Sequence, residues 1–310
     1  MTKLEQLIKD FCPDGVPTYS IDEICSISRG RVMSKDYIRE NEGIYPVYSS
    51  QTENNGELGK ISTYDFDGEY LTWTTDGANA GTVFYRNGKF SVTNVCGLLK
   101  VIKDHLITKY LYYTLNVEAP KYVNNGMGNP KLMSNVMGRI KVQIPPIEVQ
   151  REIVRILDNF TELTAELTAE LTARKQQYEY YRDSLLRFEQ GKIPIIELGE
   201  SCDLQAGKFI SASEISSIQD DENCYPCYGA NGLRGYVPIY NQNGSFPLIG
   251  RQGALCGNVC YAQGKFYATE HAVVVSQKGN YDSRFLYYLL VAGNLNQYKT
   301  SGAQPGLSVS

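Results

Sequence analysis

The sequence lacks the features of a secreted or membrane protein. No stretch approaches the roughly 20 apolar residues that a membrane-spanning helix needs. The first ten residues, Met1–Asp10, have charges inside their apolar run, which is not the pattern of a signal peptide. These absences predict a cytoplasmic protein, in which the cysteines are expected to be reduced.

An excess of positive charge is also missing, because 30 Lys and Arg residues face 34 Asp and Glu residues. Residues 1–145 have 16 basic and 16 acidic side chains, residues 146–190 have 6 and 9, and residues 191–310 have 8 and 9. A protein that binds nucleic acid strongly by itself usually has a basic face. Any contact with nucleic acid is therefore expected to depend on local loops and on partner proteins.

Catalytic signatures are absent as well. The only two histidines, His105 and His271, have no nucleophile or carboxylate constellation beside them. No glycine-rich cofactor loop follows a predicted strand, and no Gly-x4-Gly-Lys motif occurs. The segment Asn129–Leu132 resembles the Asn-Pro-Pro-aromatic motif of N6 methyltransferases only superficially, since it has neither the second proline nor the aromatic residue. We assign no catalytic residue and expect no bound cofactor.

The sequence does contain a large internal duplication. Residues 16–135 align with residues 193–310 at shifts of 175 to 180 positions. So many matches with few gaps indicate two copies of one domain. The matched pairs include Tyr45–Tyr48 with Tyr225–Tyr228, Asn55-Gly56 with Asn231-Gly232, Asp76–Ala78 with Gln252–Ala254, Gly88–Phe90 with Gly264–Phe266, and Lys109–Tyr113 with Arg284–Tyr288.

Each copy is expected to be a mixed α and β domain. Alternating runs such as Gly81–Tyr85 and Asn258–Tyr261 predict strands, which Gly- and Asn-rich turns separate. Thr108–Leu115 and Ser283–Val291 predict short helices. The predicted fold class is α+β, with homologous domains in residues 1–145 and 191–310 and a helical spacer in residues 146–190.

The spacer is predicted to be one long helix. Pro145 and Pro146 suit its first turn, and Gly191 and Pro194 end it after about Phe188. Its apolar residues recur at spacings of three and four, which predicts coiled-coil-type pairing with another long helix; the alternative is a solitary amphipathic helix lying on a domain. The predicted pairing residues are Ile153, Ile156, Phe160, Leu163, Leu167, Leu171, Tyr178, Tyr181 and Leu185.

A tetrapeptide repeats within this helix, because Thr-Ala-Glu-Leu occupies both Thr164–Leu167 and Thr168–Leu171. One copy adds about 6 Å of helix and roughly 40° of rotation. The step from Leu167 to Leu171, followed by Tyr178, is a stutter, a four-residue insertion in the heptad pattern. The repeat is therefore interpreted as a length adjuster between the two domains.

These features together resemble the DNA-specificity subunit of type I restriction–modification enzymes. The most specific segments are Ile144–Ile153 and the Thr-Ala-Glu-Leu tetrads, with support from Gln176–Leu186 and Gln304–Leu307. The resemblance implies two target-recognition domains that each read half of a bipartite site, with the tetrads setting the unread gap. It further implies a non-catalytic subunit that recruits two adenine-N6 methyltransferase subunits, which use S-adenosylmethionine, and motor-nuclease subunits, which use ATP and Mg.

One departure from the family pattern is that no second spacer helix follows the second domain in this sequence. A truncated gene and a helix supplied in trans are the alternatives, and self-association through the spacer is expected. A protein-interaction scaffold without DNA readout is the alternative function.

Polar residues in predicted loops are the candidates for DNA contact. Arg and Gln can each read a base edge through two hydrogen bonds, which makes Arg251 and Gln252, facing Thr75 and Asp76 in register, the leading base-reading candidates. Loop drift or a solvated turn is the alternative at the others. The remaining candidates are Arg29, Arg31, Lys35, Ser50, Gln51, Asn54, Asn55, Asn129, Lys131, Lys208, Asn231, Arg234 and Gln304.

Four cysteines have spacings that could fit a zinc site, Cys224-x2-Cys227 and Cys256-x3-Cys260. Their counterparts in the first copy are the apolar residues Ile44, Val47, Ala80 and Phe84. A free cysteine behaves as a small buried hydrophobe. The duplication thus favours a structural role, and no metal is assigned.

Overall fold

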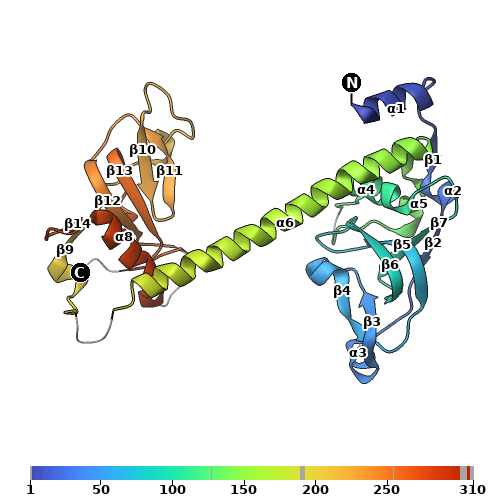
Figure 1. Ribbon diagram of the computed structural model, residues 1–310, viewed down its shortest axis with the longest axis horizontal. Helices are drawn as coiled ribbons and strands as arrows, with labels where there is room; N and C mark the ends of the chain where they lie inside the picture. The colour runs from blue at the N-terminus through green and yellow to red at the C-terminus, as the bar shows by residue number, and fades with distance from the viewer. Residues whose placement is uncertain (1, 127, 189–192, 254, 301–305, 308–310) are drawn as a thin grey trace. The chain divides into compact units, whose positions relative to one another are not determined.

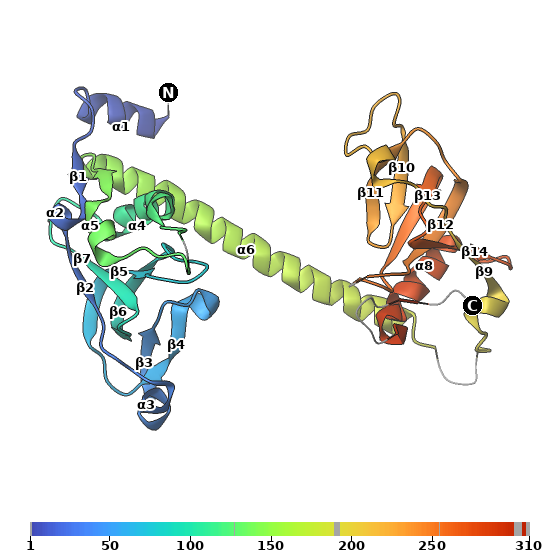
Figure 2. The same ribbon diagram turned by 180° about the vertical axis from the view of Figure 1, so that it is seen from behind.

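The computed structural model describes residues 2–126, 128–188, 193–253, 255–300 and 306–307. The elements form two compact units, Met1–Thr168 (unit 1) and Ala169–Ser310 (unit 2). Helix α6, Ile147–Leu185, belongs partly to each of them. Figures 1 and 2 show the elements from opposite sides.

Unit 1 is built on a six-stranded sheet with the strand order β2-β7-β5-β6-β3-β4. Strand β3 runs parallel to β6, and the other neighbours are antiparallel. The strands are β2 (Cys25–Arg29), β3 (Glu42–Tyr48), β4 (Glu57–Ile61), β5 (Phe66–Thr74), β6 (Val83–Val92) and β7 (Cys96–Val101). A separate pair joins β1 (Thr18–Ser20) to β8 (Lys141–Gln143).

Unit 1 also contains short helices and 3-10 turns. They are α1 (Lys3–Phe11), α2 (Ile21–Ile24), α3 (Lys35–Glu40), α4 (Thr108–Glu118) and α5 (Ser134–Arg139), with the 3-10 turns η1 (Glu53–Gly56) and η2 (Ala119–Tyr122). Leu111 and Leu115 of α4 pack on Leu71 and Trp73 of β5 in the main core. Trp73 is fully buried and donates its indole N–H to the Leu132 carbonyl at 2.9 Å, which fixes the chain that follows η2.

Unit 2 repeats the topology of unit 1. Its sheet order is β9-β14-β12-β13-β10-β11, with β10 parallel to β13, which matches the order in unit 1 strand for strand. The elements are α7 (Leu198–Ser201), β9 (Cys202–Ala206), η3 (Ala212–Glu214), β10 (Tyr225–Gly229), β11 (Gly232–Val237), β12 (Gln242–Gly250), β13 (Val259–Ala268), β14 (Ala272–Gln277), α8 (Ser283–Ala292) and η4 (Leu295–Tyr298).

The duplication extends to the pairing register. Phe66 pairs with Phe90 in unit 1, and Gln242 pairs with Phe266 in unit 2, so that both partners are shifted by the same 176 positions. The predicted match of Asp76 with Gln252 also holds, because each forms an isolated bridge to the segment that follows a 3-10 turn, at Lys131 after η2 and at Gly306 after η4. The sequence-based alignment therefore reproduces the spatial equivalence of the two units.

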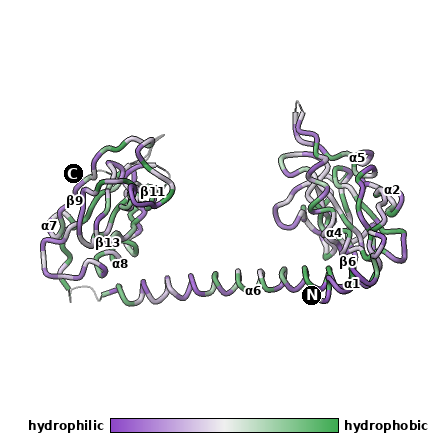
Figure 3. The backbone as a smooth tube through the Cα atoms, turned by 90° about the horizontal axis from the view of Figure 1, so that it is seen from above, coloured by the Kyte–Doolittle hydropathy of each residue, from purple (hydrophilic) through white to green (hydrophobic). Residues whose placement is uncertain are grey.

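Helix α6 begins directly after Pro146, as predicted, and ends at Leu185, slightly before the expected Phe188. Its 39 residues correspond to about 58 Å. Ile153 packs against the core of unit 1. Asp158 still contacts Lys109 and Tyr113 of α4, and from Phe160 to Tyr181 the helix is exposed. Figure 3 shows apolar and polar residues alternating along it. Phe160, Leu163, Leu167 and Leu171 are 63, 49, 58 and 55% exposed.

A buried polar contact attaches the start of α6 to unit 1. Gln150 is fully buried, and its side-chain oxygen accepts the Ile107 N–H at 2.9 Å. Its amide group donates to the carbonyls of His105 and Pro145 at 2.9 and 2.8 Å. One side chain thus satisfies three backbone groups, which fixes the helix on the domain.

Helix α1 is held beside the same part of α6 by an ion pair. Lys3 lies 2.8 Å from the Glu152 carboxylate, which Arg155 also contacts at 2.7 Å. The hydrogen bonds from Arg155 and Lys3 lower the pKa of Glu152 to about 2.

Within the described ranges, no helix is long and apolar enough to cross a membrane.

Candidate nucleic-acid interface

Three turns meet at one edge of the sheet in unit 1. The Thr93 N–H, in the turn between β6 and β7, donates to the Tyr48 carbonyl at the end of β3 at 2.9 Å. The Thr75 hydroxyl, after β5, donates to the Val95 carbonyl at 2.7 Å, and the Ser50 hydroxyl donates to the same carbonyl. The ends of β3 and β5 are therefore joined through the β6–β7 turn.

The same three turns meet in unit 2. The Thr269 N–H donates to the Tyr228 carbonyl at 2.9 Å, and the Arg251 N–H donates to the His271 carbonyl at 3.0 Å. A cavity of about 320 Å³ opens between the turns. It brings together three predicted DNA contacts, and its lining residues are Ala230, Asn231, Arg234, Gln252, Gly253 and His271.

A fourth segment joins this edge in each unit. The Leu132 N–H donates to the Thr75 carbonyl, and the Leu307 N–H donates to the Arg251 carbonyl, both at 2.9 Å. Asn129 and Lys131 are exposed there and line a smaller cavity of about 170 Å³. The predicted contact Gln304 lies outside the described residues.

The candidates at this edge differ in how accessible they are. Thr75 is only 3% exposed, and its hydroxyl is used inside the unit. Asp76, Arg251 and Gln252 are half-buried, whereas Asn54 and Asn55 are exposed. Gln51 is half-buried and donates to the Glu57 carbonyl at 2.5 Å, so that it closes its own loop.

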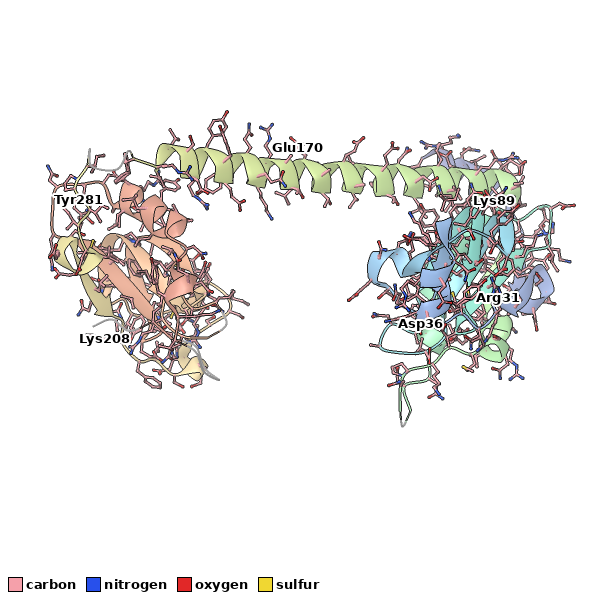
Figure 4. The ribbon with its side chains drawn as sticks, turned by 90° about the horizontal axis from the view of Figure 1, so that it is seen from below. Arg31, Asp36, Lys89, Glu170, Lys208 and Tyr281 are labelled. Carbon is pink, nitrogen blue, oxygen red and sulfur yellow. The ribbon has the colours of Figure 1, made fainter. Side chains whose placement is uncertain are left out.

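The remaining basic candidates do not line the two cavities at this edge. Arg29 donates to the Ser134 hydroxyl at 3.2 Å, and Arg31 forms an ion pair with Asp65 at 3.1 Å and lies over the Tyr37 ring. Lys35 is exposed at the start of α3. Lys208 is exposed in unit 2 and forms a bridge to Thr269 that is equivalent to the bridge between Arg31 and Thr93 (Figure 4).

The sequence interpretation missed the turn between β13 and β14. His271 lines the cavity beside Gln252, and its ring lies 3.1 Å from the Glu270 carboxylate. Within the described part of the chain, one oxygen of that carboxylate and the Thr269 hydroxyl are buried without a hydrogen-bond partner. Val95 and His271 occupy equivalent positions in the two copies, and this change from an apolar to a polar residue could have identified the turn.

The four cysteines considered for zinc lie in different environments. Cys227 is in the apolar cluster with Ile210 and Val237, whereas Cys260 packs in a separate cluster with Phe266. Burial raises the pKa of Cys260 to about 11 and also raises the pKa of Cys227. Among the described residues, no group of three or more His, Cys, Asp or Glu side chains could hold a metal ion.

Fold and site together define a class of protein: a duplicated recognition domain with different polar tips on one scaffold, joined by a long helix. A family model described as the type I restriction modification DNA specificity domain matches residues 13–174 and again residues 192–310. The chain therefore belongs to this family, and the two matches confirm the duplication.

Similar proteins agree with the family assignment. A putative type I specificity subunit from Mycoplasma pneumoniae is 36% identical over 296 residues, which cover 93% of this chain and 81% of that protein. The N-terminal part of another putative type I specificity subunit from the same organism is 53% identical over 179 residues, or 55% of this chain and 96% of the relative.

The fold agrees with a solved structure as well. The crystal structure of the S subunit of a type I restriction–modification system from M. genitalium has a TM-score of 0.68 at 19% identity, covering 96% of this chain and 81% of that one. The predicted fold class and the predicted DNA-specificity function are thus confirmed, and the scaffold alternative is set aside.

Proposed function

We propose that this chain is the non-catalytic DNA-recognition subunit of a type I restriction–modification complex, and that each unit reads one half of a bipartite site. The observation in favour is that both units place polar side chains at the same edge of the same scaffold, but with different chemistry. Thr75 and Asp76 of unit 1 correspond to Arg251 and Gln252 of unit 2. Two different half-sites require different side chains at equivalent positions of one backbone.

Helix α6 sets the unread gap between the half-sites in this proposal. Its tetrads lie in the solvated part of the helix, so that a change in their number alters length and rotation without disturbing either sheet. The exposed apolar residues Leu163, Leu167 and Leu171 pair with a second long helix, which another copy of this chain can supply.

Partner subunits supply the chemistry. Two adenine-N6 methyltransferase subunits would use S-adenosylmethionine, and the restriction subunits would use ATP and Mg. Neither copy of the duplicated domain has a basic excess, since residues 1–145 are balanced and residues 191–310 have one more acidic than basic side chain. Strong DNA binding therefore requires the assembled complex.

The test is to map methylated adenines in cells that contain this chain with its partners. We expect a bipartite motif of two short defined halves and an unread gap. Methylation of a single continuous motif, or of no defined motif, would contradict the proposal. A strain that lacks only this chain is the control and should show no such methylation.

A further inference from the structure

Unit 1 contains a buried arginine that has no acidic partner in the sheet. Arg86, in the middle of β6, is 3% exposed and forms no ion pair with any described residue. Burial lowers the pKa of its guanidinium, as expected for a cation removed from water. A buried charge without a carboxylate partner is costly and is retained only where its other contacts matter.

Those contacts point to one loop. The Arg86 guanidinium stacks on the Tyr48 ring at 3.5 Å and on the Phe84 ring at 4.6 Å, and it donates to the Thr72 hydroxyl at 3.1 Å. Its outer nitrogen, Nη2, donates to the Asn55 carbonyl at 2.8 Å. The arginine is therefore held by side chains of β3, β5 and β6, and its free end contacts the loop that contains η1.

The loop has a backbone conformation that needs such support. Asn54 and Asn55 have φ values of 48° and 53°, and Gly56 follows at 78°, so that three consecutive residues are left-handed. Non-glycine residues adopt this region reluctantly and keep it only where their surroundings determine it. The turn directs the two exposed asparagines outward while its backbone is bonded from below.

The loop is continuous with the candidate interface. The Ser49 N–H donates to the Gly56 carbonyl at 3.0 Å, and the Ser49 hydroxyl accepts from Thr93 at 3.2 Å. The Asn79 amide, in the turn after β5, donates to the Thr52 hydroxyl at 2.8 Å. The position of this loop is therefore coupled to the turns that meet at the edge of the sheet.

Unit 2 lacks both the long loop and the arginine. The residue equivalent to Arg86 in register is Ala262, and the equivalent of Thr72 is Leu248; both lie in an apolar cluster. The turn between β10 and β11 is four residues shorter, with Asn231 directly before Gly232. Both units have the same strands, but only the unit with the longer loop has the arginine.

We infer that Arg86 is a specificity-determining positioning residue of unit 1, which holds the Asn54-Asn55 turn in the conformation that reads the first half-site. The inference rests on the proposed function. Arg86 touches no DNA in this role, and it acts through the Asn55 carbonyl. It predicts that loss of the arginine changes which bases are accepted in one half-site without changing the other half-site or the gap.

The experiment compares variants of the full chain in the reconstituted complex on a library randomised in both half-sites. With Arg86→Gln, we expect discrimination at the bases read by unit 1 to fall by about tenfold or more. Asn54→Ala combined with Asn55→Ala should relax the same positions. Methylation of sites that retain the second half-site and the gap should persist, which a merely structural defect would not allow.

A second variant tests the same contact from the loop. A Cβ added at Gly56 would lie 3.0 Å from the Arg86 Nη2 at a backbone φ of 78°. Gly56→Ala keeps the buried cation but disturbs its contact with the loop, so that it is informative even if Arg86→Gln fails to fold. An unchanged preference for the first half-site in Gly56→Ala would overturn the inference.

The control is Leu111→Val, a change in the main core of unit 1, in a different apolar cluster from the Tyr48 ring on which Arg86 stacks. It should leave the base preference unchanged, and equal relaxation in this variant would also overturn the inference. The wild-type chain separates the two proposals. If wild type shows no bipartite motif, the proposed function itself fails, whereas a motif that Arg86→Gln leaves intact refutes the role of Arg86 alone.

Discussion

At the scale of residues, the two units use the same backbone positions for different side chains. Arg251 and Gln252 lie half-buried where unit 1 has Thr75 and Asp76. Arginine can donate two hydrogen bonds to a base edge, and glutamine can donate one and accept one. The Thr75 hydroxyl is already bonded to the Val95 carbonyl. Unit 2 is therefore expected to read more through this turn than unit 1 does.

Replacing Arg251 and Gln252 by alanine should relax the second half-site by about tenfold to a hundredfold per base, because a bidentate contact contributes about 1–3 kcal/mol of discrimination. Mapping the methylated motif measures this. Gln263→Ala, an exposed glutamine of β13, is the matched control. If the motif is the same in all variants, neither residue reads a base.

Gln150→Ala should destabilise unit 1 by about 1–3 kcal/mol, because it leaves one buried and two part-buried backbone groups without their partner. The single tryptophan, Trp73, is buried in unit 1, so that its fluorescence during urea unfolding reports this unit alone. Gln176→Ala, on the exposed part of the same helix, should leave the midpoint unchanged. Equal midpoints for the two variants would show that Gln150 is not an anchor.

At the scale of elements, α6 combines a fixed end with a solvated middle. Its start is bonded to unit 1 through Gln150 and through the contacts of Lys109 and Tyr113 with Asp158, at 2.7 and 2.6 Å. The residues from Phe160 to Tyr181 are exposed, and the side chain of Glu170 extends from this part (Figure 4). We expect length changes to be tolerated in the tetrads, because their side chains are exposed.

Deleting Thr168–Leu171 should shorten the gap and leave both half-sites intact. The loss of about 6 Å corresponds to one or two base pairs at roughly 3.4 Å each. Glu170→Gln, which keeps the length, should keep the gap. Sequencing of the methylated motif distinguishes the outcomes, and a changed half-site sequence would refute the spacer role.

Replacing both Leu163 and Leu171 by glutamate should abolish self-association, because charges would then lie within the apolar seam. Light scattering should give a mass above the 34.7 kDa of one chain for wild type and for Glu162→Gln, and the monomer mass for the double variant. A wild-type chain that is a clean soluble monomer would show that the seam does not pair copies of this chain.

At the scale of the whole molecule, the charge balance decides how binding is shared with partners. A net charge of −4 gives no long-range attraction to DNA, so that in the proposed complex we expect most of the affinity to come from surfaces of the partner subunits. Recognition by this chain and affinity of the complex are then separate properties.

The isolated chain should leave a target duplex unshifted in a gel at concentrations where the assembled complex binds it fully. Raising the salt concentration should weaken binding of the complex steeply, since the partners' phosphate contacts dominate it. The same duplex with both half-sites scrambled is the control for sequence dependence. Tight and specific binding by the chain alone would contradict this division of roles.

The duplication, the long helix and the class of protein could all be predicted from the amino-acid pattern. Hydrophobic spacing specifies α6 locally, and the matches between the copies specify the common scaffold, so that the equivalence of Asp76 and Gln252 could be predicted. The motif Ile144–Ile153 could be recognised as a signature, although its pattern did not reveal what Gln150 does.

Which side chains meet could be learned only from the folded chain. His271 joins Gln252 in the cavity, Arg31 is paired with Asp65, and Arg86 supports the Asn54-Asn55 turn. These contacts form between segments brought together by strand pairing and sheet packing, and no local periodicity encodes them. Periodic patterns report where a residue faces, whereas loop conformation depends on distant backbone groups that become neighbours only on folding.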